Sequence, residues 1–216
     1  GDTGIDKTTY LNHYPLVALL TSGTTGEYKA VRINTQSLEE RMKETLRIFA
    51  PDFKEDPDNT RMGYLGAVGL WSLGGFVMPM LAFRCMATVA LEQRPGHEAD
   101  VLSLPVVSVI LTPMELVDLL KALPPNAPRR DDLRILVAGG SLPWAITEQL
   151  LARVTRTVIN TLGSTEIGAI GFSFLQRPGD QFIYIISPDF AVEIVDSDDA
   201  PVACVTPCKL DVPPGP

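Results

Sequence analysis

The sequence predicts an α/β fold in which a largely parallel sheet is flanked by helices and followed by a strand-only C-terminal part. Between residues 62 and 154, short apolar runs alternate with segments of helical pattern, and the connections are short. Such alternation is typical of parallel strands joined by helices. Beyond Thr155, apolar runs follow one another without helices between them. The chain has 216 residues, 45% of them hydrophobic and 20% charged, so we expect one domain with a sizeable core.

The predicted domain has five parts along the chain. Residues 1–15 are an irregular polar lead, 16–33 a hairpin of two apolar strands, 34–160 the α/β core, 161–196 a strand-rich part and 197–216 a Pro-rich tail. We find no internal repeat of fixed period. The domain is therefore expected to be a single layered unit rather than a repeat array.

Two helix starts in the predicted core carry capping signals. Ser37 and Glu40 have the spacing of a capping box, and Thr112 followed by Pro113 supplies an N-cap and a proline at the first helical position. Apolar runs and their periodicity indicate the other elements. The predicted strands are Met62 to Gly66, Cys85 to Leu91, Val106 to Leu111, Leu133 to Val137, Thr157 to Leu162, Ile167 to Leu175, Gln181 to Ser187 and Phe190 to Val195, and the predicted helices are Val68 to Phe83, Pro113 to Leu123 and Leu142 to Val154.

An uncharged block from Met62 to Phe83 has two interpretations. It is long enough to span a bilayer. Several glycines and Pro79 punctuate it, however, and Arg84 interrupts its continuation. A strand, a helix and a further strand buried on both faces explain the block as well, and we favour this interpretation over stable membrane insertion. Partition between membrane and soluble fractions separates the two.

Charge and cysteine content restrict the partners. A net charge of −8 repels nucleic acid and anionic lipid, so we expect no nucleic-acid partner, and a phosphate ligand must be held by a local site. Cys85, Cys204 and Cys208 form no even disulfide framework, and no secretory leader begins the sequence, so we expect a cytoplasmic setting. Cys204 and Cys208 lack the further ligands that a zinc site needs.

The segment from Leu16 to Ile33 reads as a strand, a loop of small residues and a second strand. Glycines in such a loop allow backbone amides to converge on phosphate oxygens, hydroxyls add donors, and a lysine adds a positive charge. An ordinary hairpin turn has the same composition. A Walker loop is excluded, because Ala30 follows the lysine where Ser or Thr is required. The candidate phosphate-binding residues are Thr21, Ser22, Gly23, Thr24, Thr25, Gly26 and Lys29.

The order of these residues resembles the signature loop of the adenylate-forming superfamily. That superfamily includes acyl-CoA and aryl-CoA synthetases, luciferases and the adenylation domains of peptide synthetases, and its loop runs T-S-G-S/T-T-G-x-P-K-G. The stretch from Thr21 to Lys29 matches it in order, with Tyr28 in place of proline and Ala30 in place of the last glycine.

Two further segments resemble motifs of the same superfamily. Ala138 to Ser141 is similar to the G-G/A segment that lines the adenine pocket. Asn160 to Glu166 is similar to the Y-G-x-T-E motif, although Leu162 replaces the aromatic residue that usually stacks on adenine. Loss of that stacking weakens a site by about 1 kcal/mol without abolishing it.

The resemblance implies roles for individual residues. Residues 22–26 and Lys29 would hold the β- and γ-phosphates of ATP, and Thr165 would contact the α-phosphate. Glu166 would bind Mg²⁺, a hard cation that usually takes one or two protein carboxylates beside phosphate oxygens. Lys29, Thr165 and Glu166 are thus the implied catalytic residues. The implied nucleotide-binding residues of the two later motifs are Gly139, Gly140, Ser141, Leu162, Gly163, Ser164 and Thr165.

The implied activity is ATP-dependent activation of a carboxylic acid to an acyl adenylate, followed by transfer to a thiol such as CoA. If Trp71 is matched to the aromatic residue of the peptide-synthetase motif F-D-x-S-x-W, Ala67 stands where that motif has its amine-binding aspartate, which disfavours an α-amino acid. The helix expected from Val68 either lines a pocket for an acyl or aryl carboxylate or belongs to the core.

Family members are longer than this chain, which resembles only a middle part of their large N-terminal domain. A ribose-binding aspartate motif and a C-terminal lid with its catalytic lysine are not found downstream of Asp199. We therefore expect the isolated chain to be inactive or severely impaired in the full reaction. A non-catalytic nucleotide-binding or scaffold domain and a membrane-associated protein remain as alternatives, and the oligomeric state is left open.

Overall fold

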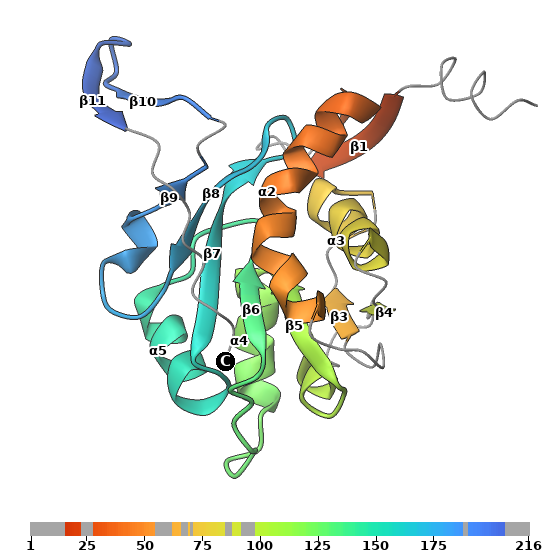
Figure 1. Cartoon of the computed structure of the whole chain (residues 1–216). Coiled ribbons are helices and arrows are strands. Elements are labelled where there is room, and N and C mark those ends of the chain that lie inside the picture. Colours follow the sequence, from red (N-terminus) through yellow and green to blue (C-terminus); the bar gives the residue numbers. More distant parts are fainter. Residues whose placement is uncertain are drawn as a thin grey trace, which may run out of the picture.

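The computed structural model describes residues 16–22, 28–54, 62–65, 69, 71–84, 88–91, 98–187 and 190–205. Its main feature is a mixed sheet in the order β4-β3-β5-β6-β7-β8-β9 (Figure 1). Neighbouring strands from β4 to β7 are parallel, and β8 and β9 are antiparallel, which confirms the predicted largely parallel sheet. The strands are β3 (Met62–Leu65), β4 (Thr88–Leu91), β5 (Val106–Leu111), β6 (Arg134–Val137), β7 (Thr157–Ser164), β8 (Gly168–Phe174) and β9 (Ile185–Ile186).

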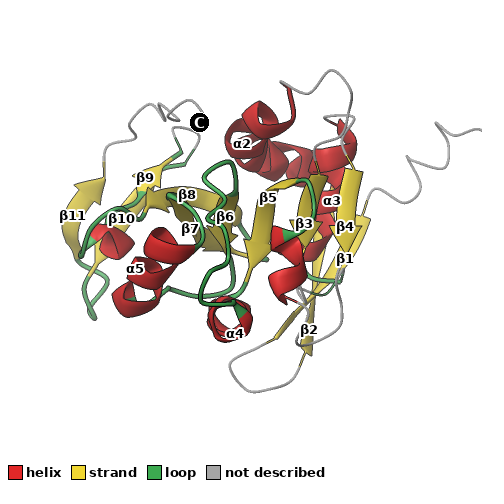
Figure 2. Ribbon diagram, turned by 90° about the horizontal axis from the view of Figure 1, so that it is seen from below, coloured by secondary structure: helices red, strands yellow, loops and turns green. Residues whose placement is uncertain are grey.

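Helices cover both faces of this sheet (Figure 2). On one face, α2 (Thr35–Lys54) and α3 (Leu73–Arg84) form a hydrophobic core with the sheet, in which Met42 and Met78 pack with Phe172. On the other face, α4 (Pro113–Ala122) and α5 (Trp144–Arg153) form a second core that includes Leu116 and Leu150. All residues of β5 and β6 are buried, because strands covered on both faces have no exposed side.

Two antiparallel hairpins lie outside the main sheet. One joins β1 (Leu16–Ser22) to β2 (Tyr28–Asn34), and the other joins β10 (Val192–Val195) to β11 (Pro201–Val205), which projects away from the sheet in Figure 1. The first hairpin is anchored, because the Leu20 amide donates to the carbonyl oxygen of Trp71 at 2.8 Å. Strand β11 also shows that part of the predicted Pro-rich tail is a strand.

Three helices begin at residues other than those predicted, and in two of them a different side chain caps the start. Helix α2 begins at Thr35, and Asn34 Oδ1 accepts from the Ser37 amide at 2.7 Å, so the predicted capping box at Ser37 is wrong. Helix α3 begins at Leu73 rather than Val68, and Ser72 Oγ accepts from the Gly75 amide at 3.1 Å. Helix α5 begins at Trp144, after Pro143 in an extended conformation.

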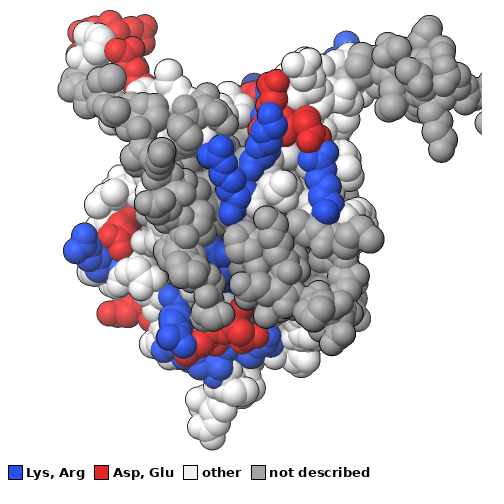
Figure 3. Space-filling model, in the orientation of Figure 1, with Lys and Arg blue, Asp and Glu red and all other residues white. Residues whose placement is uncertain are grey.

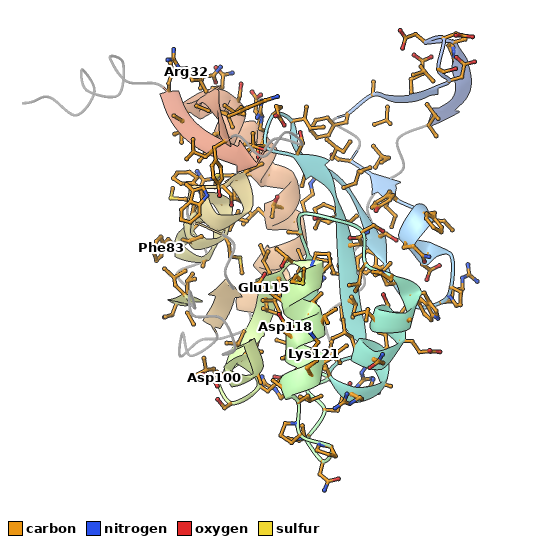
Figure 4. All side chains as sticks on the ribbon, turned by 180° about the vertical axis from the view of Figure 1, so that it is seen from behind. Arg32, Phe83, Asp100, Glu115, Asp118 and Lys121 are labelled. Atoms are coloured by element: carbon orange, nitrogen blue, oxygen red, sulfur yellow. The ribbon has the colours of Figure 1, made fainter. Side chains whose placement is uncertain are left out.

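Helix α4 confirms the other capping signal. The Thr112 hydroxyl accepts from the Glu115 amide, and the Glu115 carboxylate accepts from the Thr112 amide at 2.8 Å, which completes a capping box. Farther along the same helix, Asp118 and Lys121 form an ion pair of 2.9 Å (Figure 4). The capping box thereby fixes Thr112 directly after the carboxyl end of β5.

The C-terminal part was predicted to contain strands only, but it also contains a short helix. A 3₁₀ helix, η2 (Asp180–Phe182), stands where a strand from Gln181 was predicted, and only β9 follows before residue 187. The Asp180 carboxylate accepts from the backbone amides of Gln176 and Arg177, which closes a local turn and prevents extension. A second 3₁₀ helix, η1 (Glu98–Leu102), precedes β5. Strand β7 extends to Ser164 rather than Leu162.

The uncharged block is distributed between the sheet and the core. It contributes β3 and α3, whose Val77, Met78 and Leu81 are buried against α2 and the sheet. Within the described ranges, no helix combines the length and the apolar character needed to cross a membrane. On the surface, Arg84 of α3 pairs with Glu39 of α2, and this pair joins the two helices. The structure confirms the strand and helix interpretation for these residues.

Candidate functional site

A cavity of about 740 Å³ opens where the parallel strands end. Residues that follow β5 and β6 and the last residues of β7 line it, together with parts of β1, α2 and α3. In open α/β sheets, ligands bind at this edge because loops and helix starts converge there. The predicted site residues among the lining are Thr21, Gly139, Gly140, Ser141, Leu162, Gly163, Ser164 and Thr165.

The loop between β6 and α5 presents exposed backbone to the cavity. Gly139 has φ of +80°, a conformation that favours glycine, and Gly139, Gly140 and Ser141 are all exposed. The loop is tied to β5 by the Ala138 amide, which donates to the Leu111 carbonyl oxygen at 3.0 Å. A strip of backbone without side chains at its glycines allows the close approach of a flat ring, and the role of this segment in binding adenine stays a prediction.

The turn between β7 and β8 is tightly constrained. A Cβ atom at Gly163 would lie 2.1 Å from the carbonyl oxygen of Gly168, so only glycine fits there. Gly168 has φ of +82° and packs against the side chain of Arg41 on α2. Arg41 Nη1 also donates to the Thr165 carbonyl oxygen at 3.2 Å. The turn that carries Thr165 and Glu166 is therefore held by its own glycines and by α2.

Glu166 is exposed and does not belong to the residues that line the cavity, although Thr165 and Gly168 on either side of it do. Hydrogen bonds from the Ser164 hydroxyl and from its own backbone amide lower the pKa of the Glu166 carboxyl, and the positive charges of Lys29 and Arg41 lower it further. Its carboxylate is thus ionised at neutral pH. The prediction brought Lys29 and Glu166 into one site, and the structure brings their charges close enough to interact.

The tip of the predicted phosphate loop lies outside the described residues. Strands β1 and β2 place Thr21 opposite Lys29 and Ser22 opposite Tyr28, and both Thr21 and Tyr28 line the cavity. The ends of β1 and β2 therefore lie at the cavity. The predicted phosphate-binding residues that fall outside the description are Gly23, Thr24, Thr25 and Gly26. Their predicted roles, and that of the Ser22 side chain, stay predictions.

The residues around Glu166 fit a magnesium ion only together with phosphate oxygens. Among the described residues, no group of three or more His, Cys, Asp or Glu side chains is placed to hold a metal. One ionised carboxylate, with Lys29 and Arg41 nearby, suits an anionic ligand that brings its own metal. Mg²⁺ commonly binds in this way, through one or two carboxylates, phosphate oxygens and waters.

The opposite wall of the cavity is largely apolar. It includes Leu73, Gly74 and Val77 of α3, together with Trp71 and Phe172. Helix α3 therefore both lines a cavity and belongs to the core, the two alternatives that the sequence left open. Its first turns line the cavity, and Met78 and Leu81 on its later turns are buried. The space beside the β6 to α5 loop is thus polar at the strand ends and apolar towards α3.

Arg41 and Tyr184 are among the lining residues that the sequence analysis did not predict. Arg41 lies among other charged residues of α2, and Tyr184 lies in a segment predicted as an ordinary strand, so neither carried a local signal. Asn160 Nδ2 donates to the Tyr184 hydroxyl oxygen at 2.7 Å, and burial raises the pKa of Tyr184. Asn160 is buried, and its Oδ1 atom has no hydrogen-bond partner in the described part of the chain.

Surface charge agrees with a local anion site rather than a general one. On the face shown in Figure 3, basic side chains gather over α2 beside acidic ones, and acidic side chains cover the β10 to β11 hairpin. The chain as a whole carries a net charge of −8. Arg41 therefore brings positive charge to the cavity within an acidic protein, whereas Lys29 does not line the cavity and acts on the nearby Glu166 carboxyl.

Comparison with known families agrees with this geometry. The family model described as AMP-binding enzyme matches residues 8–207, which is most of the chain. The chain belongs to the AMP-binding enzyme family. No curated protein matches it. Family membership confirms the resemblance drawn from the three sequence motifs and accounts for their meeting at one edge of the sheet.

Solved structures similar to this AMP-binding chain include two proteins with synthetase in their names and a third named VinN. O-succinylbenzoate coenzyme A synthetase (MenE) of Bacillus subtilis, in complex with ATP and magnesium ion, has a TM-score of 0.62 and 22% identity, over 86% of this chain and 38% of its own. An acyl-CoA synthetase (AMP-forming)/AMP-acid ligase II-like protein of Dyadobacter fermentans DSM 18053 has a TM-score of 0.60 and 20% identity, over 88% and 52%. VinN has a TM-score of 0.66 and 16% identity, over 87% and 47%.

These likenesses establish the fold of the AMP-binding chain. It spans about a third to a half of the length of the solved proteins that it matches. The structure thus has part of the fold of the AMP-binding enzymes, as the resemblance predicted.

Proposed function

We propose that the protein carrying this sequence activates a carboxylic acid with ATP, giving an acyl adenylate and pyrophosphate, and then transfers the acyl group to a thiol such as CoA. Family membership supports the adenylate-forming part. Transfer to a thiol is the more specific part of the proposal. It is supported by the names of similar structures, which include two CoA synthetases.

The observation that carries the proposal is the convergence of three distant segments on one cavity. Thr21 at the edge of the phosphate loop, Gly139 to Ser141, and Leu162 to Thr165 all line it, although they lie far apart in sequence. A strand-end cavity with exposed backbone on one side and an apolar wall on the other suits a nucleotide beside an organic acid.

The first step has a simple balance of bonds. A carboxylate oxygen attacks the α-phosphorus of ATP, and the bond from that phosphorus to the oxygen that bridges to the β-phosphate breaks, so pyrophosphate leaves. In the second step a thiolate attacks the acyl carbon, and AMP leaves with the bonding electrons. The protein aligns two anions and stabilises the negative charge on the phosphates, with no covalent intermediate on its own side chains.

Named residues have distinct tasks in this proposal. The loop of residues 22–26 and Lys29 hold the terminal phosphates, and the Thr165 hydroxyl contacts the α-phosphate. Glu166 supplies the protein ligand to Mg²⁺, which neutralises phosphate charge when bound. The first turns of α3 face the organic acid, because Leu73 and Val77 form the apolar side of the cavity.

A second candidate is a non-catalytic domain that binds nucleotide but performs no chemistry. The observation that favours it is the departure of the chain from family motifs at Tyr28, Ala30 and Leu162. It shares the same cavity and differs only in the expected reaction.

Carboxylate-dependent exchange between ATP and labelled pyrophosphate, measured on the full-length protein with a panel of aliphatic and aromatic acids, separates the candidates. Exchange with at least one acid supports adenylation, and thioester formed on addition of CoA supports thiol transfer. Binding of ATP without exchange for any acid favours the non-catalytic domain. No binding of ATP at all contradicts both.

A further inference from the structure

Position 162 is where the family resemblance places an aromatic residue against adenine, and this chain has leucine there. Leu162 lines the cavity, and so does Tyr184, an aromatic residue from the connection between β8 and β9. We propose that Tyr184 supplies the aromatic surface of the nucleobase site, so that a ring absent from β7 is replaced by one from the neighbouring connection. This inference rests on the proposed nucleotide-binding function.

Hydrogen bonding and strand register place Tyr184 at the correct end of the sheet. Its hydroxyl oxygen lies 2.7 Å from Nδ2 of Asn160. Asn160 stands two residues before Leu162 on β7, and residues two apart on a strand face the same side. Asn160 is also the register partner of Val137, the last residue of β6. The Tyr184 hydroxyl therefore lies beside the face of β7 that carries Leu162 and beside the strand end from which the loop of Gly139 leaves.

The Tyr184 side chain is held by a hydrogen bond and is uncharged, and both properties favour stacking on a base. The bond from Asn160 fixes the hydroxyl end, and Asn160 itself is buried in the sheet. Burial raises the pKa of Tyr184, so the phenol stays neutral and adds no charge next to a phosphate ligand. The side chain is half-buried, so part of it remains open to the cavity. A ring fixed at one end loses little freedom when a base stacks on it.

The two glycines of the β6 to α5 loop line the same cavity and carry no side chain that would compete with a base. Gly139 and Gly140 are exposed, and a Cβ atom at either would meet nothing closer than 3.5 Å. A heteroaromatic base in this cavity can therefore contact this backbone as well as Leu162 and Tyr184, because all of them line the same space. Stacking on an aromatic ring is sequence-tolerant among bases, so the ring contributes affinity for the base and leaves recognition of its edges to other groups.

The test compares a ligand that has a base with one that lacks it. We would measure the Kd of ATP and of inorganic tripolyphosphate for the full-length protein and for Tyr184→Leu, Tyr184→Phe and the double variant Tyr184→Leu with Leu162→Phe. Tyr184→Leu should weaken ATP binding by about tenfold and leave tripolyphosphate binding within about twofold. Tyr184→Phe keeps the ring and should lose less than about threefold. The double variant restores a ring at the family position and should recover most of the lost affinity.

Thermal unfolding of each variant shows whether it is folded. Equal loss of ATP and tripolyphosphate binding in a folded Tyr184→Leu protein, or no loss of ATP binding, overturns the role of Tyr184 and leaves the proposed function standing. Failure of the unmodified protein to bind ATP overturns the proposed function and this inference with it. A further contradicting result is a double variant that binds ATP no better than Tyr184→Leu while Tyr184→Phe retains ATP binding. In that case positions 162 and 184 do not share one base site, and the proposal that Tyr184 replaces the aromatic residue of position 162 is contradicted.

Discussion

Arg41 Nη1 donates a hydrogen bond to the carbonyl oxygen of Thr165 at 3.2 Å, across 124 positions of sequence. The bond joins α2 to the β7 to β8 turn, and Gly168 in the same turn packs against the Arg41 side chain. Arg41 also lines the cavity, and its charge lowers the pKa of Glu166. One side chain thus fixes the position of the turn and favours the ionised state of its carboxylate.

Replacing Arg41 should therefore disturb the metal-dependent part of the reaction. We expect Arg41→Met to reduce pyrophosphate exchange by about tenfold or more, because the turn that carries Thr165 and Glu166 loses its anchor. The Mg²⁺ concentration that gives half-maximal exchange should rise at the same time. Arg41→Lys keeps the charge but not the forked geometry, and it should recover part of the loss. An unchanged Mg²⁺ dependence in folded Arg41→Met would show that Arg41 has no positioning role.

Glu166→Gln tests the proposed metal ligand itself. The substitution keeps the size of the side chain and removes its charge, so it should lower Mg²⁺-dependent pyrophosphate exchange by about a hundredfold. Binding of ATP measured without Mg²⁺ should change little. Turnover equal to that of the unmodified protein would reject the assignment of Glu166. Glu148, an exposed acid on α5, is a suitable control, and Glu148→Gln should leave exchange unaffected.

The hydrogen bond from Ser164 should be visible in the titration of Glu166. Because the carboxyl pKa is lowered in the folded chain, its ionised form is favoured, and the associated stability is present above the unfolded value of about pH 4 and lost as the pH falls through the lowered value. Ser164→Ala should raise the Glu166 pKa, as measured by NMR. Asp180, whose pKa is lowered by the backbone amides of Gln176 and Arg177, should keep its value in the same spectra. A Glu166 pKa that does not move in Ser164→Ala contradicts the assigned bond.

Gly163→Ala should destabilise the fold, because a Cβ atom there would lie 2.1 Å from a backbone carbonyl oxygen. We expect a loss of about 2 kcal/mol or more in the free energy of unfolding, measured by urea denaturation. Gly140→Ala is the matched comparison. Its Cβ atom would come no closer than 3.5 Å to Pro113, so it should change stability by less than about 0.5 kcal/mol. Equal stability of the two variants would show that the β7 to β8 turn can relax.

The parallel part of the sheet was predictable because its central strands consist mainly of apolar residues. Strands β5 and β6 are buried on both faces, and this burial appears in the sequence as short runs without alternation. Helix starts were less predictable, since neighbouring residues can serve as caps and only tertiary packing selects between them. Asn34 caps α2 although Ser37 has the better local signal, and Ser72 caps α3 within an apolar block.

The residues of the candidate site also fall into those that could be predicted from the sequence and those that could not. Thr21, Gly139 and Thr165 could be named from the sequence because each belongs to a short segment that resembles a family motif at or near the end of a strand. Arg41 and Tyr184 could not, because their contacts with Thr165 and Asn160 cross between elements and leave no pattern along the chain. The motifs thus led to residues that line the cavity in local segments, and they did not reveal residues whose contacts join separate elements.

Photolabelling tests directly whether these segments form one nucleotide site. The full-length protein would be irradiated with 8-azido-ATP, with and without excess ATP, and the labelled peptides identified by mass spectrometry. Label on the peptides that contain Gly139 to Ser141 or Leu162 to Tyr184, removed by excess ATP, is the expected result. ATP-sensitive label confined to peptides that do not line the cavity, or label that ATP does not remove, would contradict the site.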